Sequence, residues 1–150
     1  TGTRPDLFRA IVARISIDQD SPMTFLSRFT ESSYALLRIV SGAIFTFHGV
    51  QKIFGILTDH QPPLGSQLWL GGMIELVCGI LIVIGYQTRF AAFLSSGTMA
   101  VAYFQFHWKF RMGPEFFPAI NGGDAAILYC FVFLYIACRG SGIWAFEKSR

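Results

Sequence analysis

The segment from residue 68 to residue 85, LWLGGMIELVCGILIVIG, is apolar throughout except for Glu75. A helix that spans a membrane needs about 20 predominantly apolar residues, so this segment has the length and character of such a helix. Three more apolar segments, at about 34–55, 90–108 and 124–138, are each followed by turn-forming residues. The sequence therefore predicts an all-α fold, an integral membrane four-helix bundle.

The composition argues against several other classes of protein. Of the 150 residues, 53% are hydrophobic and 14% are charged, whereas soluble domains carry about 25% charged residues. Four successive helices with almost no polar face also argue against the core helices of a soluble domain. The net charge is only +3 and the basic residues form no stripe, so no nucleic acid is expected as a partner.

The cysteines and histidines have no spacing that is typical of a metal site, and no metal is expected. Cys78, Cys130 and Cys138 all lie in apolar segments, where a free cysteine behaves as a small buried hydrophobe. A redox relay that uses Cys130 and Cys138 remains the alternative.

The chain is expected to have three parts: an extension at 1–33, the membrane domain at 34–145 and a short tail at 146–150. In the extension, apolar residues recur at helical spacing, which predicts an amphipathic helix that lies on a membrane surface or on a partner protein. These apolar residues are Leu7, Phe8, Ile11, Val12 and Ile15. The extension also holds four arginines, whereas the connection after the first span holds neither Lys nor Arg. Because cytoplasmic loops are enriched in Lys and Arg, both termini are expected in the cytoplasm.

The charged residues of the first two spans are expected to meet. Ionisable side chains in a membrane usually face the interior of the helix bundle or water, because hydrocarbon solvates them poorly. Glu75 and His48 both lie roughly 10 Å from the outer ends of antiparallel spans, and Lys52 is one turn further out than His48. Gly71 and Gly79 stand one turn before and after Glu75, where small residues allow close helix packing. We predict that Glu75 pairs with His48 or Lys52, either as a functional site or as a contact that only joins two helices.

More polar residues gather at the outer end of the third and fourth spans. His107 stands near the end of the third span, and NGGD opens the fourth. Asn121 can cap this helix, and Asp124 falls in its first turn, where the helix dipole favours an anion. Capping and a membrane-boundary position are the simpler interpretations of Asp124 and His107, and ligand binding is the alternative.

The segments LLRIVSGAIFTFHGVQKIFG, GGMIELVCGILIVIGYQTR and NGGDAAILY resemble the DoxX family of small four-helix bacterial membrane proteins, over about residues 34–145. The resemblance implies the bacterial inner membrane and a link to membrane redox chemistry, since relatives include a subunit of thiosulfate:quinone oxidoreductase. It also implies eight polar signature positions. These are Arg38, His48, Lys52, Glu75, Arg89, His107, Asn121 and Asp124. Family members more often carry Glu after NGG, so Asp124 reaches one methylene less far.

The resulting functional hypothesis is a membrane subunit of a quinone-linked oxidoreductase complex, with a polar pocket near the outer leaflet. The predicted catalytic residues are His48, Lys52, Glu75 and Asp124. The predicted quinone-binding residues are Arg38, His48, Lys52, His107 and Asn121. Aromatic side chains would form an apolar slot around the ring, from Phe45, Phe47, Trp69, Phe104 and Phe106.

Two other functions remain open: a non-catalytic membrane anchor or assembly subunit, and a small solute or proton transporter. The expected partners are membrane lipid and the protein subunits of a redox complex, and a second copy of this chain remains an alternative. The sequence leaves open the substrate, the identity of the partners and whether this chain carries out chemistry itself.

Overall fold

The computed structural model describes residues 24–147, and within this range every regular element is a helix. The amphipathic helix predicted around residues 7–15 and the last three residues lie outside the described residues. The chain divides into two units, Thr1–Ser33 and Tyr34–Arg150, and all the contacts considered below lie within the second. The all-α prediction is confirmed for the part of the chain that the structure describes.

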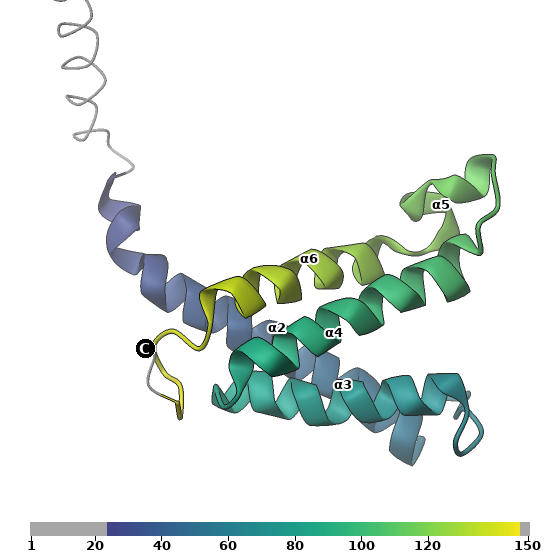
Figure 1. Cartoon of the computed structure of the whole chain (residues 1–150), viewed down its shortest axis with the longest axis horizontal. Helices are drawn as coiled ribbons and strands as arrows, with labels where there is room; N and C mark the ends of the chain where they lie inside the picture. Colours follow the sequence, from purple (N-terminus) through teal and green to yellow (C-terminus); the bar gives the residue numbers. More distant parts are fainter. Residues whose placement is uncertain (1–23, 148–150) are drawn as a thin grey trace, which may run out of the picture. The chain divides into compact units, whose positions relative to one another are not determined.

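Four long helical segments make up most of residues 24–147, and the first of them begins in the first unit and continues into the second (Figure 1). They are α2 at Thr30–Phe54, preceded by the 3-10 helix η2 at Thr24–Phe29, α3 at Gln67–Ile84, α4 at Thr88–Ala102, which continues as the π-helix η3 at Tyr103–Trp108, and α6 at Asp124–Arg139. Two short helices, η4 at Pro114–Phe116 and α5 at Pro118–Asn121, lie between η3 and α6. Each predicted span therefore corresponds to a helix, with ends that differ by a few residues.

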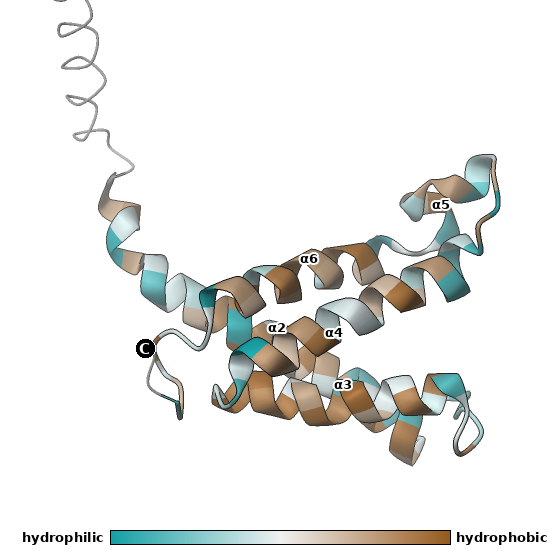
Figure 2. Ribbon diagram, in the orientation of Figure 1, coloured by the Kyte–Doolittle hydropathy of each residue, from teal (hydrophilic) through white to brown (hydrophobic). Residues whose placement is uncertain are grey.

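Two helical segments are each long and apolar enough to cross a membrane, Phe25–Phe54 and Gln67–Ile84. The sequence predicted four such spans. The third and fourth helices are shorter, because α4 leaves α-helical geometry after 15 residues and α6 has only 16. Figure 2 shows hydrophobic residues along most of α3 and α6, and hydrophilic residues mainly near helix ends and loops.

The ends of α3 are set by local signals in the sequence. At its start, the hydroxyl oxygen of Ser66 accepts a hydrogen bond from the backbone N–H of Trp69 at 3.2 Å. At its end, Gly85 takes a left-handed φ of 72°, and the N–H groups of Gly85 and Tyr86 both donate to the Leu81 carbonyl at 3.0 Å. This turn reverses the chain into α4. We call the end of the domain with this turn and segment 140–147 the turn end, and the end with loops 55–66 and 109–123 the loop end.

Glycines bring α2 and α3 into close contact. A Cβ atom on Gly49 would lie 2.7 Å from the Leu76 Cα, and one on Gly79 would lie 2.7 Å from the Thr46 backbone nitrogen. A Cβ on Gly72 would lie 2.7 Å from the Lys52 Cβ. The sequence placed Gly71 at this contact, which is wrong: a Cβ there would meet nothing within 4 Å.

The core lies where the four helices meet, around Phe45, Ile82, Phe133 and Ile136, each no more than 1% exposed. The outer faces carry many exposed large hydrophobic side chains. Examples are Phe93 at 67%, Leu128 at 66% and Phe131 at 64%. So much exposed apolar surface is unusual for a soluble monomer and suits contact with lipid.

The three cysteines are free thiols, with Cys78 buried, Cys130 half-buried and Cys138 exposed. The prediction that all three are buried is therefore wrong for Cys138. This residue sits one position before the end of α6, where its side chain meets the surface.

Candidate functional site

Lys52 and Glu75 form an ion pair between α2 and α3, with 2.5 Å between the Lys52 Nζ and the Glu75 Oε1. The side chain of Glu75 is 3% exposed and that of Lys52 is 31% exposed. Gly72 makes the pair possible, because its missing Cβ leaves room for the aliphatic stem of Lys52 beside α3. The predicted pairing of Glu75 is confirmed, with Lys52 as the partner.

The ion pair uses only one of the two carboxylate oxygens of Glu75. The other, Oε2, is buried and has no hydrogen-bond partner within the described residues. A buried acceptor without a donor costs about 1–3 kcal/mol, so native proteins contain few of them. The Glu75 side chain therefore presents an open acceptor inside the domain.

A polar cavity of about 160 Å³ lies beside this ion pair. All four helical segments contribute to its lining, with His48 from α2, Glu75 from α3, Met99 from α4, His107 from η3 and Tyr129 from α6. His48 and Glu75, which the sequence placed at the same depth in antiparallel spans, both border this cavity. The structure therefore brings together His48, Lys52, Glu75 and His107 of the predicted site.

The π-helix η3 carries His107 to the cavity. The Nδ1 of His107 lies 3.3 Å from the Asn121 carbonyl oxygen, which can only accept a hydrogen bond. In the neutral imidazole, Nδ1 then holds the proton and Nε2 is left as an acceptor. Sequence reasoning did not anticipate the π-helix, since a local widening of the helix has no clear signal in residue spacing.

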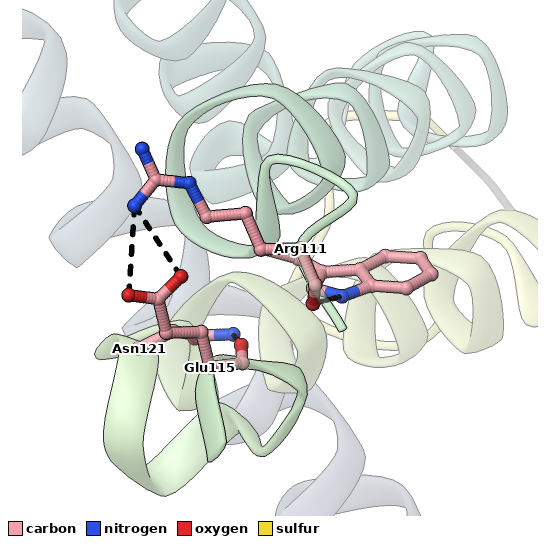
Figure 3. Close-up of polar contacts among 4 residues, drawn as sticks. Arg111, Glu115 and Asn121 are labelled. Atoms are coloured by element: carbon pink, nitrogen blue, oxygen red, sulfur yellow. Dashed lines mark hydrogen bonds and ion pairs between the residues drawn. The ribbon is translucent and has the colours of Figure 1, made fainter. Parts of the chain in front are cut away.

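The Asn121 side chain shapes the loop and does not border the cavity. Its Nδ2 donates to the Glu115 carbonyl at 2.9 Å, and its Oδ1 accepts from the Gly123 N–H at 2.8 Å. Figure 3 shows Asn121 beside Glu115, together with the ion pair between Arg111 and Glu115, in which the Arg111 nitrogen and the Glu115 oxygen are 3.3 Å apart. Gly123 is needed here because a Cβ would lie 2.7 Å from ring carbons of Tyr103. The NGG motif therefore positions the backbone carbonyl that holds His107.

Asp124 lies in the first turn of α6, as the sequence predicted, and its side chain is exposed. It is not among the residues that line the polar cavity, whereas its neighbours Ala125 and Ala126 are. Its predicted role in proton transfer stays a prediction.

An apolar groove of about 380 Å³ runs between α3 and the α4–η3 segment. The two helices meet at the Gly85 turn and diverge toward the loop end (Figure 1). Lys52 and Glu75 border this groove as well as the polar cavity, and the remaining lining is almost entirely aliphatic or aromatic. Leu70 and Phe93 at its rim are 53% and 67% exposed, so the groove opens on the lateral surface of the domain.

The aromatic slot predicted from sequence is only partly assembled. Phe106 lines the apolar groove and Phe45 lines the polar cavity. Phe47, Trp69 and Phe104 line neither of these two cavities.

A third cavity of about 470 Å³ lies at the loop end, beneath the connection between α2 and α3. Asp59, His60, Gln61 and Lys52 line it. The loop is held to α2 by Gln61, whose Nε2 donates to the Ile53 carbonyl at 2.6 Å. Lys52 therefore borders all three cavities, whereas Glu75 borders two of them and Asp59 one.

The comparison with protein-family models matches residues 33–108 to DoxX. The chain belongs to the DoxX family. It is also 38% identical over 130 residues to an uncharacterized protein of Haemophilus influenzae, an alignment that covers 84% of this chain and 96% of that protein. No solved structure matches the chain. The predicted resemblance is confirmed, and DoxX membership together with the apolar helices indicates a membrane protein in contact with lipid.

Two more of the polar positions that the resemblance implied, Arg38 and Arg89, lie at the turn end and line none of the three cavities. Arg38 is fully buried and donates to the carbonyls of four residues. These are Ile82 at 2.5 Å, Val83 at 2.8 Å, Trp144 at 2.7 Å and Ile143 at 3.2 Å. Lys52 is 14 residues further along α2, about 21 Å along the helix axis. The structure therefore does not bring Arg38 to the residues predicted to bind the quinone with it.

Arg89 has the same kind of role at the end of α6. Its guanidinium donates to the carbonyls of Ala137 at 3.0 Å, Cys138 at 2.5 Å and Arg139 at 3.2 Å. The last carbonyls of a helix lack partners within the helix and carry partial negative charge, so a cation is favoured there. In this DoxX protein, sequence reasoning missed that both arginines cap helix C-termini, although Arg89 follows a helix-ending turn in the sequence.

No group of three or more His, Cys, Asp or Glu side chains in residues 24–147 is arranged to hold a metal ion. The side chains of Lys52, Glu75 and the two histidines can donate or accept hydrogen bonds and transfer protons.

Proposed function

We propose that this DoxX protein is a membrane subunit of a quinone-linked oxidoreductase complex, in which it holds the quinone. The ion pair of Lys52 and Glu75 is the main support for this proposal. It borders a polar cavity on one side and an open apolar groove on the other. This is the arrangement that a lipophilic molecule with a polar head requires.

A quinone head has two carbonyl oxygens, and each accepts hydrogen bonds. The ammonium of Lys52 has three donors, of which the ion pair with Glu75 uses one. His48 lines the same cavity and can donate to a second oxygen. The ring of Phe45 and that of Tyr129 line the cavity as well, with centroids 6.2 Å apart, and offer apolar faces to a flat head.

The apolar groove supplies a place for a long hydrocarbon tail. Its lining is aliphatic and aromatic except near Lys52, Glu75, Gln67 and Thr98. Ligand sites in proteins commonly enclose about 300–1,000 Å³, and the groove of about 380 Å³ falls in that range. Since it opens on the lateral surface, a ligand dissolved in lipid could enter without crossing water.

We place this site in a four-helix integral bundle in the bacterial inner membrane, with both termini in the cytoplasm. The α4–η3 segment runs from Thr88 to Trp108 without a break and is long enough to span, although α4 alone is not. At 16 residues α6 is about 24 Å long, which a locally thinned bilayer accommodates. The polar cavity then lies toward the outer leaflet, beneath the loop without Lys or Arg.

A non-catalytic anchor or assembly subunit is the second candidate. The glycine contacts at Gly49, Gly72 and Gly79 favour it, since an ion pair beside them can serve only to fix the register of α2 against α3. A transporter is the third candidate, because Lys52 borders cavities on three sides. Four short helices are few for alternating access, so we rank it last.

Ligand binding by the purified full chain tests the proposal. We would reconstitute the protein in nanodiscs and titrate a benzoquinone with an isoprenoid tail, following the quenching of tryptophan fluorescence. The wild type should bind, and Lys52→Met should weaken binding at least about tenfold, because a hydrogen bond from a charged group is lost. Lys109→Met is the matched control, since Lys109 is exposed in the 109–123 loop.

If the protein is a non-catalytic anchor or assembly subunit, the same experiment should give different results. It would give no saturable quinone binding, while extraction in mild detergent would still yield a stoichiometric complex with an oxidoreductase. A flux of protons or solute through protein in sealed liposomes would instead support the transporter.

A further inference from the structure

We infer that the site prefers the hydroxyl-bearing form of its ligand, a hydroquinone head, over the dicarbonyl form. This inference rests on the proposed function for the class of ligand, and on Glu75 Oε2 for the preference. Oε2 is buried, it belongs to a side chain that is 3% exposed, and it has no hydrogen-bond partner in the described part of the chain.

The open oxygen calls for a hydrogen-bond donor. Glu75 is held by Lys52 through Oε1, and an ionised carboxylate has acceptors only. Besides Lys52, three polar side chains share the cavity with it, His48, His107 and Tyr129, yet none of them donates to Oε2. A ligand that displaces water from beside Glu75 must therefore supply an N–H or O–H group of its own if this acceptor is to be satisfied.

His107 offers the cavity a second acceptor, from a different helix. His107 gives its Nδ1 hydrogen to the Asn121 carbonyl, so in the neutral ring Nε2 has a lone pair and no hydrogen. Glu75 and His107 reach the cavity from α3 and η3 respectively. Two acceptors on different elements match a head with two hydroxyl groups.

The oxidised head fits these groups less well. A quinone carbonyl carries only lone pairs, so it would face Glu75 Oε2 as one acceptor against another, and the buried carboxylate oxygen would stay unsatisfied. A site that is built to bond a hydroxyl rejects an analogue that lacks it, because its own polar group is then left without a partner. Lys52 can donate to either form and does not discriminate between them.

Three ligands with the same ring and tail test the preference on the full-length protein in nanodiscs. They are the hydroquinone, kept reduced under anaerobic conditions, the quinone, and the dimethyl ether of the hydroquinone, which has no donor. Isothermal titration calorimetry measures each Kd. We expect the hydroquinone to bind at least about tenfold more tightly than either of the others, as one lost hydrogen bond to a charged group would give.

The variant Glu75→Gln should reverse the preference between hydroquinone and quinone. An amide keeps one acceptor toward Lys52 and turns an N–H donor toward the cavity, so this variant should prefer the quinone. Glu115→Gln is the matched control, since Glu115 is half exposed in the 109–123 loop, and it should keep the preference of the wild type.

The outcomes separate this inference from the proposed function. Equal binding of hydroquinone and quinone, or tighter binding of the quinone, overturns the preference and leaves the quinone site standing. Failure of all three ligands to bind overturns both. If Glu75→Gln does not fold, the three ligands on the wild-type protein still decide, because that comparison needs no variant.

Discussion

At the turn end of the domain, Arg38 donates to four backbone carbonyls, whereas at the loop end Glu75 accepts from one donor and keeps a second oxygen open. Both side chains are buried, at 0% and 2% exposed. Of the three guanidinium nitrogens of Arg38, Nε alone lacks a partner within the described residues, and none of the three cavities includes Arg38.

The difference separates two uses of a buried charge. Arg38 satisfies carbonyls at the end of α3 and in segment 143–144, so it joins parts of the chain that are far apart in sequence. Glu75 leaves an acceptor beside two cavities, and a ligand or water must satisfy it. The turn end is therefore expected to control stability, and the loop end to control binding.

Arg38→Met should have the largest effect and should break the fold before it affects the site. The carbonyls of Ile82, Val83 and Trp144 would lose their donor in a buried setting, at a total cost above about 3 kcal/mol. Thermal unfolding in detergent, followed by circular dichroism, measures this.

Arg111→Met is the control for Arg38→Met, since Arg111 is 63% exposed and pairs only with Glu115. If the Arg38 variant were as stable as the wild type but no longer bound quinone, the turn end would control binding and not stability, contrary to this expectation.

Lys52→Met should destabilise less, by about 2 kcal/mol, because it leaves the buried carboxylate of Glu75 without its partner while water still reaches the cavities. The double variant Lys52→Met/Glu75→Leu should recover most of that stability, since it also removes the unpaired charge. Quinone binding should be weakened at least about tenfold in both.

Chemical denaturation together with quinone titration separates the two effects of the Lys52 variants. The comparison fails if the double variant regains binding as well as stability, because the ion pair would then have no part in holding the ligand.

Two glycines, Gly49 on α2 and Gly71 on α3, sharpen the comparison further. Gly49→Ala should cost about 2 kcal/mol, since the new Cβ would lie 2.7 Å from the Leu76 Cα and the backbones must move apart. Gly71→Ala should be neutral or stabilising by up to about 1 kcal/mol, because alanine favours the helix and no atom lies within 4 Å. Unfolding midpoints of the two variants measured side by side provide the check, and a greater loss for Gly71→Ala would contradict the packing described here.

The helix contact at Gly72, which the sequence assigned to Gly71, shows what a sequence can predict and what it cannot. The length of the apolar runs predicts the four helices. Residue spacing along antiparallel spans predicts that Glu75 pairs with His48 or Lys52, and the structure shows the pair with Lys52. One position along a helix is a rotation of about 100°, and the choice of Gly72 over Gly71 depends on how α2 crosses α3. Spacing within a single helix does not contain that information.

The roles of Arg38 and His107 were beyond prediction for a related reason. Two of the four carbonyls that hold Arg38 come from residues 143 and 144, more than 100 positions further along the chain. His107 reaches the cavity through a π-helix and a bond to the Asn121 carbonyl. Both roles arise from contacts between distant segments, which a pattern within one helix does not reveal.

Arg89→Met should destabilise less than Arg38→Met, by about 1 kcal/mol of unfolding free energy. It tests whether burial determines how much an arginine stabilises the turn end. Arg89 bonds three carbonyls at the end of α6, much as Arg38 does at the end of α3. Its side chain is exposed, however, so water can replace the guanidinium at those carbonyls once it is removed. Unfolding measured under the same conditions as for Arg38→Met gives the comparison directly, and quinone affinity should not change. If the two arginine variants were equally destabilised, the number of carbonyls bonded and not the exclusion of water would account for the stability of this end.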